Sequence, residues 1–491
     1  MSVPVDVRVG AAAPVSRRVG VVLVVGLAAA LRFSELGARG FWRDEAVTVQ
    51  LARRSFGGML EAIPHSEGTP PLYYVLAWLW TRLFGSSEAG IRSLSALAGT
   101  IAVLVVYAIG VELVSHRVAL AAALLAAVNP LLVWHSQDAR SYGLFTLLGA
   151  LSFLAFLRAL ANPGTAELVA WTLASALALG THYFAAFLVV PEAIWLLASR
   201  RRRTSVVVAV GAFGLVGAAL VPLALAQRSS AEIGWIAQIP RLRRIRELAE
   251  QFLVGPQAPA AHTLAALASV CVLGALVVLL TRGSERERRG ALLAGAVAAA
   301  AMLLALALSL AGIDYFLSRN LIVAWVPLAV TAAAGFAGSR SGAVGAAALA
   351  VLVGLSLAVV VSTARKPKFG GEDWRGAARA LGTSTDDRAV VLWLGVGADP
   401  FVLYRPHARR MSEAGAFVRE VDVVSVGADH AGISSKGASL YPPEPFRQAA
   451  RIDERYFTIV RFRSAHAQHV RPATLVSGGP GYSAAVLLDQ R

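Results

Sequence analysis

Long runs of apolar residues follow one another along the first three quarters of the chain, with short polar stretches between them. Runs of roughly 18 residues or more are long enough to cross a membrane as helices. Eleven spans are predicted on this basis. They lie at about 18–34, 90–112, 118–135, 141–160, 168–182, 183–199, 204–227, 261–280, 290–311, 319–338 and 341–363. The pattern therefore predicts an α-helical, polytopic membrane protein.

Two apolar segments differ from ordinary membrane spans. The first run follows Arg17 and Arg18 as a signal peptide would, but no small-residue cleavage site comes after it, so we expect a retained first helix. The segment Pro71–Phe84 (PLYYVLAWLWTRLF) has only fourteen residues, which is short for a span. Its tyrosines and tryptophans suit the headgroup level, so an interfacial or re-entrant helix is predicted.

Clustered arginines orient these spans. They occur at Arg200–Arg203, Arg282–Arg289 and Arg340, and more weakly at His116-Arg117. With the N-terminus in the cytoplasm, eleven spans place all of these loops inside, as the positive-inside rule requires. We therefore expect a plasma-membrane protein with an extracytoplasmic tail. The external segments are then about 35–89, 136–140, a turn near 181–182, 228–260, 312–318 and everything after about 364.

The composition changes at about residue 364, so two domains are expected: a membrane domain over 1–363 and a soluble extracytoplasmic domain over 364–491. Asp373 can cap a helix over Trp374–Leu381 that stops at Gly382. Apolar, β-rich runs follow. They lie at Ala389–Leu394, Val421–Val426, Tyr456–Phe462 and Ala484–Leu488. The tail is predicted to be a small α/β domain.

The overall composition agrees with the membrane class. Only 15% of the residues are charged, against about a quarter in a typical soluble domain. The net charge of +16 would raise nucleic acid as a partner in a soluble protein, but here the positive charge orients the spans, and no nucleic acid is expected. The single cysteine, Cys271, lies in an apolar run and allows no intrachain disulfide.

Acidic residues mark the predicted external loops. Asp44 and Glu45 follow the first span directly after Phe41 and Trp42. An acidic pair in a loop is often a solvated surface, but the aromatic neighbours suggest that this loop lies against the membrane face, where an unpaired carboxylate is costly. Asp138 and Arg140 stand in a strongly apolar setting at a helix mouth. They are either a helix-end anchor or functional residues.

Other polar residues in these loops are further candidates. His65 and Glu67 precede Pro70-Pro71, a pair that usually marks a turn between two structural elements. Two ligands are too few to predict a metal site, although a divalent cation is compatible with them. Arg319 opens a span from outside, against the general charge bias, and is therefore a functional candidate. The remaining members of the external polar set are His182, Tyr183 and Trp235.

A carboxylate, a few arginines and a cleft at the membrane edge suit transfer from a lipid-phosphate-linked sugar. Polyprenyl phosphate is a good leaving group, so one carboxylate base can take the proton of an acceptor hydroxyl. Arginine, or a metal, would stabilise the departing phosphate. By themselves the same residues would also fit a phosphatase or a lipid transporter.

The order of the motifs resembles a known family, the bacterial family-39-like membrane glycosyltransferases of the GT-C superfamily. Relatives include the protein O-mannosyltransferases and the lipid A aminoarabinose transferases. The motifs that match are FWRDEAVT, GTPPLYYVLAWLWTRLFG-SSEAGIRSLSAL, NPLLVWHSQDARSYGLFTLL, THYFAAFLVVPEAIWLL, GWIAQIP, SRNLIVAWVPLAV and DWRGAARAL. The resemblance spans nearly the whole chain.

The resemblance implies a GT-C fold, a polyprenyl-phosphate sugar donor and inversion at the anomeric carbon. Asp44 would be the catalytic base with Glu45 as its motif partner, and Asp138 would be the second acid. The residues that would contact donor or substrate are Arg140, Arg319, His65, Tyr73, Tyr142 and His182. Many relatives have His or another polar residue where this chain has Thr69, and Ser-Arg-Tyr where it has Ser318-Arg319-Asn320.

Two other classes of function stay open. A transporter or flippase of a lipid-linked sugar would show charges within the spans and related halves, and the sequence shows little of either. A scaffold with an exported domain would leave the loop residues unexplained. The sugar, such as mannose or arabinose, and the acceptor, which is a protein hydroxyl, a lipid or a glycan, do not follow from the sequence.

Overall fold

The computed structural model of the chain consists of two compact units. It describes residues 15–200, 204–230, 236, 238–365, 372–384, 387–393, 398–427, 442, 444–475 and 485–489. The first unit contains residues up to Leu36 and from Arg54 to Ser362. The second contains Gly37–Arg53 together with the chain from Thr363 onwards. A short segment directly after the first helix is thus part of the C-terminal unit.

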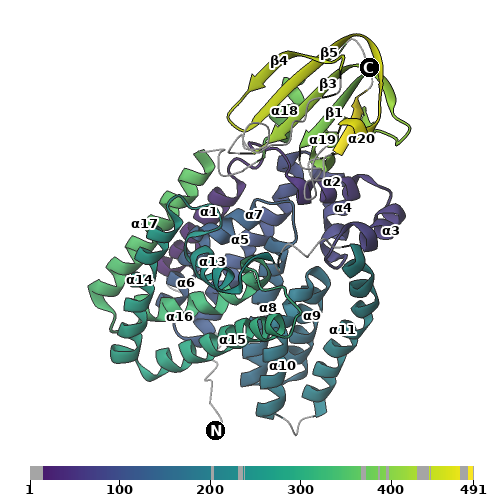
Figure 1. Cartoon of the computed structure of the whole chain (residues 1–491). Coiled ribbons are helices and arrows are strands. Elements are labelled where there is room, and N and C mark those ends of the chain that lie inside the picture. The colour runs from purple at the N-terminus through teal and green to yellow at the C-terminus, as the bar shows by residue number, and fades with distance from the viewer. Residues whose placement is uncertain are drawn as a thin grey trace. The chain divides into compact units, whose positions relative to one another are not determined.

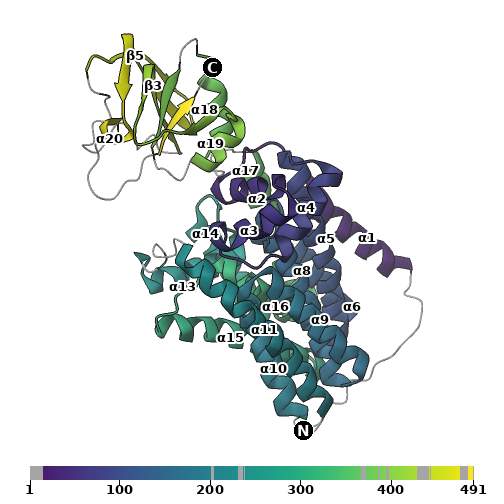
Figure 2. The ribbon, with the colours of Figure 1, turned by 90° about the vertical axis from the view of Figure 1, so that its right-hand side faces the viewer.

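The first unit is helical throughout its described residues (Figure 1). Its helices are α1 (Val15–Phe33), α3 (Phe56–Ser66), α4 (Leu72–Phe84), α5 (Glu88–Leu113), α6 (His116–Val128), α7 (Pro130–Ser136), α8 (Tyr142–Ala161), α9 (Thr165–Thr181), η1 (Tyr183–Ala185), α10 (Ala186–Arg200), α11 (Thr204–Ser230), α13 (Arg241–Val254), α14 (Ala261–Arg282), α15 (Glu285–Leu310), η2 (Ser318–Ala324), α16 (Trp325–Ala337) and α17 (Gly342–Arg365). In both Figure 1 and Figure 2, α8 lies beside α9 and α10.

Every predicted span coincides with one helix or with two consecutive helices, but not every helix is long enough to cross a membrane. Among the described residues, seven helices pass a test of length and apolarity, and one bent pair gives an eighth. Helix α9 and the segment Tyr183–Ser199 are apolar but shorter. Helix α1 contains three arginines and is not among the seven. The multi-pass class is confirmed, whereas a count of eleven spans stays a prediction.

The predicted span 118–135 is wrong as a single helix. Helices α6 and α7 meet at an angle of 57°. Pro130 lacks a backbone N–H and starts a new helix, whose first turn Asn129 caps by accepting from the backbone N–H of Leu132 at 3.1 Å. The break deprives carbonyls of α6 of their helical partners. The buried side chain of Arg32 in α1 donates to the carbonyls of Ala126 and Ala127, at 2.8 and 2.9 Å.

Close packing of small residues positions the loop after α7. A Cβ atom on Gly143, in the first turn of α8, would lie 2.7 Å from the backbone oxygen of Ser95 in α5. Only glycine therefore allows α8 to approach α5 so closely. This contact places the loop 137–141 directly against α5, and its residues 138–141 are all buried.

The second unit contains a mixed six-stranded sheet with the order β2-β6-β1-β3-β5-β4. Its elements are α2 (Arg43–Arg53), α18 (Trp374–Ala380), β1 (Arg388–Trp393), α19 (Ala398–Tyr404), β2 (Ala408–Arg410), β3 (Ala416–Val426), β4 (Arg447–Asp453), β5 (Phe457–Val470), α20 (Pro472–Leu475) and β6 (Ala485–Asp489). Strands β1 and β3 are parallel, with α19 in the connection between them, and the other pairs are antiparallel.

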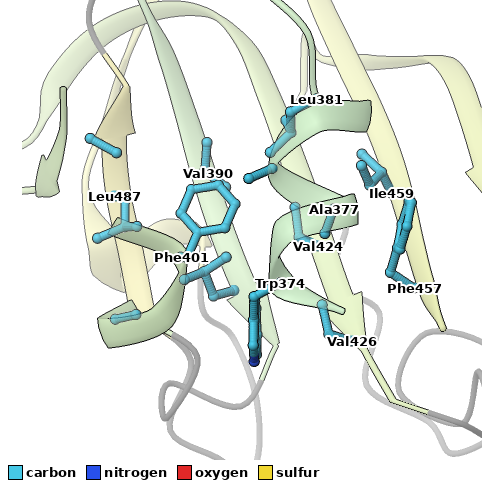
Figure 3. Close-up of a cluster of buried hydrophobic side chains, with 14 of the residues drawn as sticks. Trp374, Ala377, Leu381, Val390, Phe401, Val424, Val426, Phe457, Ile459 and Leu487 are labelled. Atoms are coloured by element: carbon cyan, nitrogen blue, oxygen red, sulfur yellow. The ribbon is translucent and has the colours of Figure 1, made fainter. Parts of the chain in front are cut away.

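Two short helices cover one face of this sheet (Figure 3). Trp374, Ala377 and Leu381 at α18 point towards the strands, as does Phe401 of α19. The strand residues that meet them include Val390, Val424, Ile459 and Leu487. Asp373 caps α18 by accepting from the N–H of Gly376 at 2.7 Å, and Gly382 follows with a positive φ of 64°, as the sequence predicts.

The four predicted strands correspond to β1, β3, β5 and β6. The predicted fold class, a helical membrane protein with a small C-terminal α/β domain, is therefore confirmed. Strands β2 and β4 are not apparent from the sequence. Strand β2 has three residues, and β4 is a largely exposed edge strand with no apolar run.

Candidate active site

The loop between α7 and α8 is the centre of a buried polar cluster in the first unit. Arg140 donates to both carboxylate oxygens of Glu67, at 2.7 and 3.1 Å. Both side chains are buried. A fork-to-fork pair of this kind fixes the guanidinium plane as well as its position. Asp138, in the same loop, lies 3.4 Å from His135 Nδ1.

Glu67 owes its position to the way α3 ends. It is the C-cap residue of α3, with extended backbone angles, and its N–H still bonds to the carbonyl of Ile63. The turn that follows is tied down by Thr69, whose hydroxyl lies 2.6 Å from that of Tyr74. Gln227 of α11 donates to the carbonyl of Thr69 at 2.9 Å. The Pro-Pro segment is therefore held from both sides, and Glu67 is held with it.

Tyr73 joins the cluster through α5. Its hydroxyl lies 3.1 Å from that of Ser95, which in turn donates to the carbonyl of Arg140 at 2.9 Å. Tyr73 is therefore a support of the Arg140 backbone. His65, two residues before Glu67, is exposed, in contrast to the buried members of the cluster.

Aromatic rings line the cluster. The ring of Tyr142 lies 4.6 Å from His135 and 5.7 Å from His182, between ring centres. Phe145 stacks on His182 at 4.7 Å. His182 is brought here by the end of α9, where it is the C-cap residue. Aromatic side chains beside a few polar groups are a common lining of ligand-binding sites.

His182 lies between two helices and is fully buried. Burial and, to a smaller extent, the positive charges of Arg140 and Arg319 together lower its pKa to about 3. The imidazole is therefore neutral at neutral pH. Its Nδ1 accepts from the backbone N–H of Phe184 at 3.4 Å, which assigns the ring proton to Nε2. His182 can donate one hydrogen bond there but adds no charge.

Arg319 lies in η2, and the side chains on either side of it in the sequence are held by hydrogen bonds. Ser318 donates to Gln251 of α13, and Asn320 donates to the carbonyl of Tyr315 at 2.8 Å. The electrostatic effect of both arginines on His182 shows that Arg319 belongs to the same polar region as Arg140. Tyr183 faces a different partner, Gln227, to which it donates at 2.7 Å. Trp235 lies outside the described residues.

The predicted base and its partner are found in the second unit. Asp44 and Glu45 form the first turn of α2, where acidic side chains favour the helix dipole. Glu45 is fully buried and accepts from the backbone N–H of Trp42 at 3.3 Å. Glu372 is a further carboxyl in this region. Burial raises its pKa, and the charge of Asp44 adds to that rise.

The structure thus brings Asp138, Arg140, Tyr73, Tyr142 and His182 into one cluster of the first unit. Sequence reasoning missed the roles of Glu67, which it considered only as a metal ligand, and of His135. A buried arginine in an apolar loop needs an acidic partner. Glu67, close to the Pro-Pro turn, was the residue in the sequence that could have been predicted as this acidic partner. Among the described residues, no three His, Cys, Asp or Glu side chains are grouped so that they could hold a metal ion.

Several solved structures resemble the chain in fold. The Archaeoglobus fulgidus oligosaccharyltransferase in its complex with zinc and sulfate is 14% identical, with a TM-score of 0.43, and the match covers 74% of this chain and 55% of that one. The chain thus spans little more than half the length of that protein. ArnT from Cupriavidus metallidurans, solved with undecaprenyl phosphate bound, is 14% identical, with a TM-score of 0.42. That match covers 90% of this chain and 97% of ArnT.

Comparison of the sequence gives a narrower but more specific result. No curated protein matches the chain. Residues 68–225 match the family described as dolichyl-phosphate-mannose-protein mannosyltransferase. The matched segment contains Asp138, Arg140 and His182, whereas Asp44 and Arg319 lie outside it. The resemblance to the protein O-mannosyltransferases is therefore confirmed for this segment of about a third of the chain.

Proposed function

We propose that the chain is a membrane glycosyltransferase that moves a sugar from a polyprenyl-phosphate donor to a hydroxyl group. The main support is that Arg140, the centre of a buried polar cluster, lies within the segment that matches the mannosyltransferase family. Lipid-phosphate donors keep their tails in the bilayer, so a site at the ends of apolar helices suits them. A multi-pass protein of this kind fits that requirement.

In the proposed reaction, Asp44 is the general base. The acceptor oxygen forms a bond to the anomeric carbon, while the bond from that carbon to the phosphate oxygen breaks. The acceptor proton passes to the Asp44 carboxylate, and the polyprenyl phosphate leaves with the bonding electrons. Attack from the face opposite the leaving group inverts the anomeric configuration. No acid is needed for the leaving group, because the phosphate is stable as an anion.

Arg140 and Arg319 would stabilise the departing phosphate through charge-assisted hydrogen bonds. Glu67 holds Arg140 in a fixed plane. Neutral His182 and the ring of Tyr142 would line the sugar or phosphate group, with Asp138 as the second acid. His65 and Tyr73 are the remaining proposed substrate contacts. A divalent cation could assist the phosphate, and its requirement is tested by adding a chelator.

The extracytoplasmic side is proposed for the reaction, with the N-terminus in the cytoplasm. The arginine-rich loops support this orientation, since the positive-inside rule places them in the cytoplasm. The acceptor would then be a hydroxyl of a cell-envelope lipid, glycan or exported protein.

The central test is the variant Asp44→Asn. The purified protein in liposomes is supplied with undecaprenyl phosphate linked to radiolabelled mannose or arabinose, and with a membrane extract as acceptor. We expect Asp44→Asn to lose at least about a hundredfold in transfer, the usual contribution of a general base. Glu61→Gln, which changes an exposed acid of α3 six residues before Glu67, is the control and should keep full activity.

Full transfer by Asp44→Asn would refute the assignment of the base. Movement of the labelled lipid across the liposome membrane, without any glycosylated product from any acceptor, would instead favour a flippase. The donor that gives product identifies the sugar.

A further inference from the structure

The segment that bears Asp44 is built into the C-terminal unit rather than into the helical unit. Residues Gly37–Arg53 stand in the sequence between two parts of the helical unit, which ends at Leu36 and resumes at Arg54. They nevertheless form one compact unit with the chain from Thr363 onwards. Helix α2 has eleven residues, and a helix of that length is marginally stable on its own. Its orientation must come from what it packs against, which includes α19.

Phe41, three residues before Asp44, is held by Tyr404. Its backbone N–H donates to the hydroxyl of Tyr404 at 2.7 Å. Its ring stacks on the ring of Tyr404, with 6.4 Å between the centres. Phe41 is 3% exposed, so loss of the tyrosine hydroxyl would leave a buried N–H without this acceptor, which is costly. Tyr404 thus fixes both the backbone and the side chain at the entrance to α2.

Arg375 of α18 holds the start of the same segment. Its guanidinium donates to the carbonyl of Gly37 at 3.0 Å and also to that of Ala38. Gly40 lies between the two anchors. A Cβ atom there would stand 3.1 Å from Cβ of Arg375 and 3.3 Å from the hydroxyl of Tyr404. The chain before α2 is therefore packed closely against Arg375 and Tyr404.

The other end of α2 is attached as well. Gln50 donates to the carbonyl of Asp399, the second residue of α19, at 3.4 Å. Glu372, whose carboxylate accepts from Trp374 Nε1 at 2.8 Å, lies close enough to be influenced by the charge of Asp44. The C-terminal unit contacts the segment before, beside and after the acidic turn.

We propose that the C-terminal domain positions the Asp44 helix for the reaction, with Tyr404 and Arg375 as its positioning residues. This role rests on the proposed function of Asp44 as base. It assigns the domain a part in turnover itself, beyond any part in holding an acceptor. Displacement of a catalytic group by about 1 Å can lower a rate by roughly a hundredfold. A loosened α2 should therefore reduce kcat more than it raises KM.

Two pairs of matched variants test this role in the full-length protein. Tyr404→Phe removes the hydroxyl that accepts from Phe41, whereas Tyr456→Phe removes a buried hydroxyl with no hydrogen-bond partner among the described residues. Arg375→Ala removes the contacts to Gly37 and Ala38, whereas Arg379→Ala changes an exposed arginine of the same helix. Activity is measured with labelled undecaprenyl-phosphate sugar, and hydrogen exchange is followed in peptides covering residues 41–53.

We expect Tyr404→Phe and Arg375→Ala to lower kcat by roughly ten- to a hundredfold. KM for the labelled donor should stay within about twofold, and exchange in residues 41–53 should become faster. Arg375→Lys should restore part of the activity. The controls Tyr456→Phe and Arg379→Ala should behave as wild type in both measurements.

Wild-type kcat in both test variants, or an equal loss in the controls, would overturn the proposal. So would a loss expressed only in KM for the donor. Failure of the proposed function can be distinguished from failure of this proposal. If Asp44 is not the base, Asp44→Asn stays active, whereas the hydrogen-exchange measurement still reports whether the C-terminal unit holds α2.

Discussion

The two acidic regions of the molecule are stabilised in opposite ways. Around Arg140, the polar groups come from the ends of neighbouring helices, and the buried guanidinium pairs with both carboxylate oxygens of Glu67. Around Asp44, a short helix is held mainly through backbone groups, by side chains more than three hundred residues away in sequence. The first region depends on helix packing and charge pairing, and the second on attachment to another fold.

The largest effect is expected from breaking the charge pair. Glu67→Ala leaves Arg140 buried without its carboxylate and should lower the free energy of unfolding by about 3–5 kcal/mol. SDS titration of the purified protein measures this. The double variant Glu67→Leu/Arg140→Met should recover most of the loss, because paired apolar residues can replace a buried ion pair. A double variant as unstable as the single one would show that the pair is not the cause.

Gly143→Ala should have an intermediate effect. The added Cβ meets the backbone oxygen of Ser95 at 2.7 Å, and overpacking of this kind costs about 1–3 kcal/mol. The shift should also disturb the Arg140 loop and lower transfer activity. Gly211→Ala, in α11, is the control, since its Cβ would meet nothing within 4 Å. Equal stability of the two variants in the SDS titration would mean that α5 and α8 adapt freely.

The smallest effect concerns pH and the second region. Burial raises the pKa of Glu372 above its ordinary value of 4.5, and Asp44 raises it further, while Trp374 and Arg43 oppose the rise. The folded unit therefore favours the protonated acid, and the stability from this source falls as pH increases from about 4.5 through the raised pKa. Glu372→Gln should remove that slope, with a change of roughly 2 °C in Tm at neutral pH. Thermal unfolding between pH 4 and pH 8 measures it, and an unchanged slope would contradict the assignment.

Much of the fold could be predicted from local sequence patterns. The apolar runs, the Asp373 cap and the β-rich segments each predict an element that the structure contains, because they depend on neighbours in sequence. The single helix predicted over 118–135 is broken at Pro130, because proline has no N–H with which to continue the hydrogen bonds of α6. Strand β4, exposed at the sheet edge, has no hydrophobic pattern to reveal it.

The site follows the same division. Arg140 and His182 could be selected because each stands in a predicted external turn between spans, whereas Tyr142 was implied by the family resemblance, and the structure groups all three. The pairing of Arg140 with Glu67 spans 73 residues, and that of Phe41 with Tyr404 spans 363. Neither leaves a local signature in the sequence. Such partners are brought together by tertiary packing, so they could not be predicted from the local pattern of a single sequence.

The arginine of the first helix has a consequence for how the protein is made. Arg32 finds its acceptors on Ala126 and Ala127, 94 and 95 residues further along the chain. While the chain is being synthesised, α1 leaves the ribosome long before those carbonyls exist. A charged residue in lipid has to be paired or to reach the interface, and Arg32 can bond to these carbonyls only after α6 has been made. The contact of the first helix with the break at Pro130 therefore forms only once the sixth helix is present.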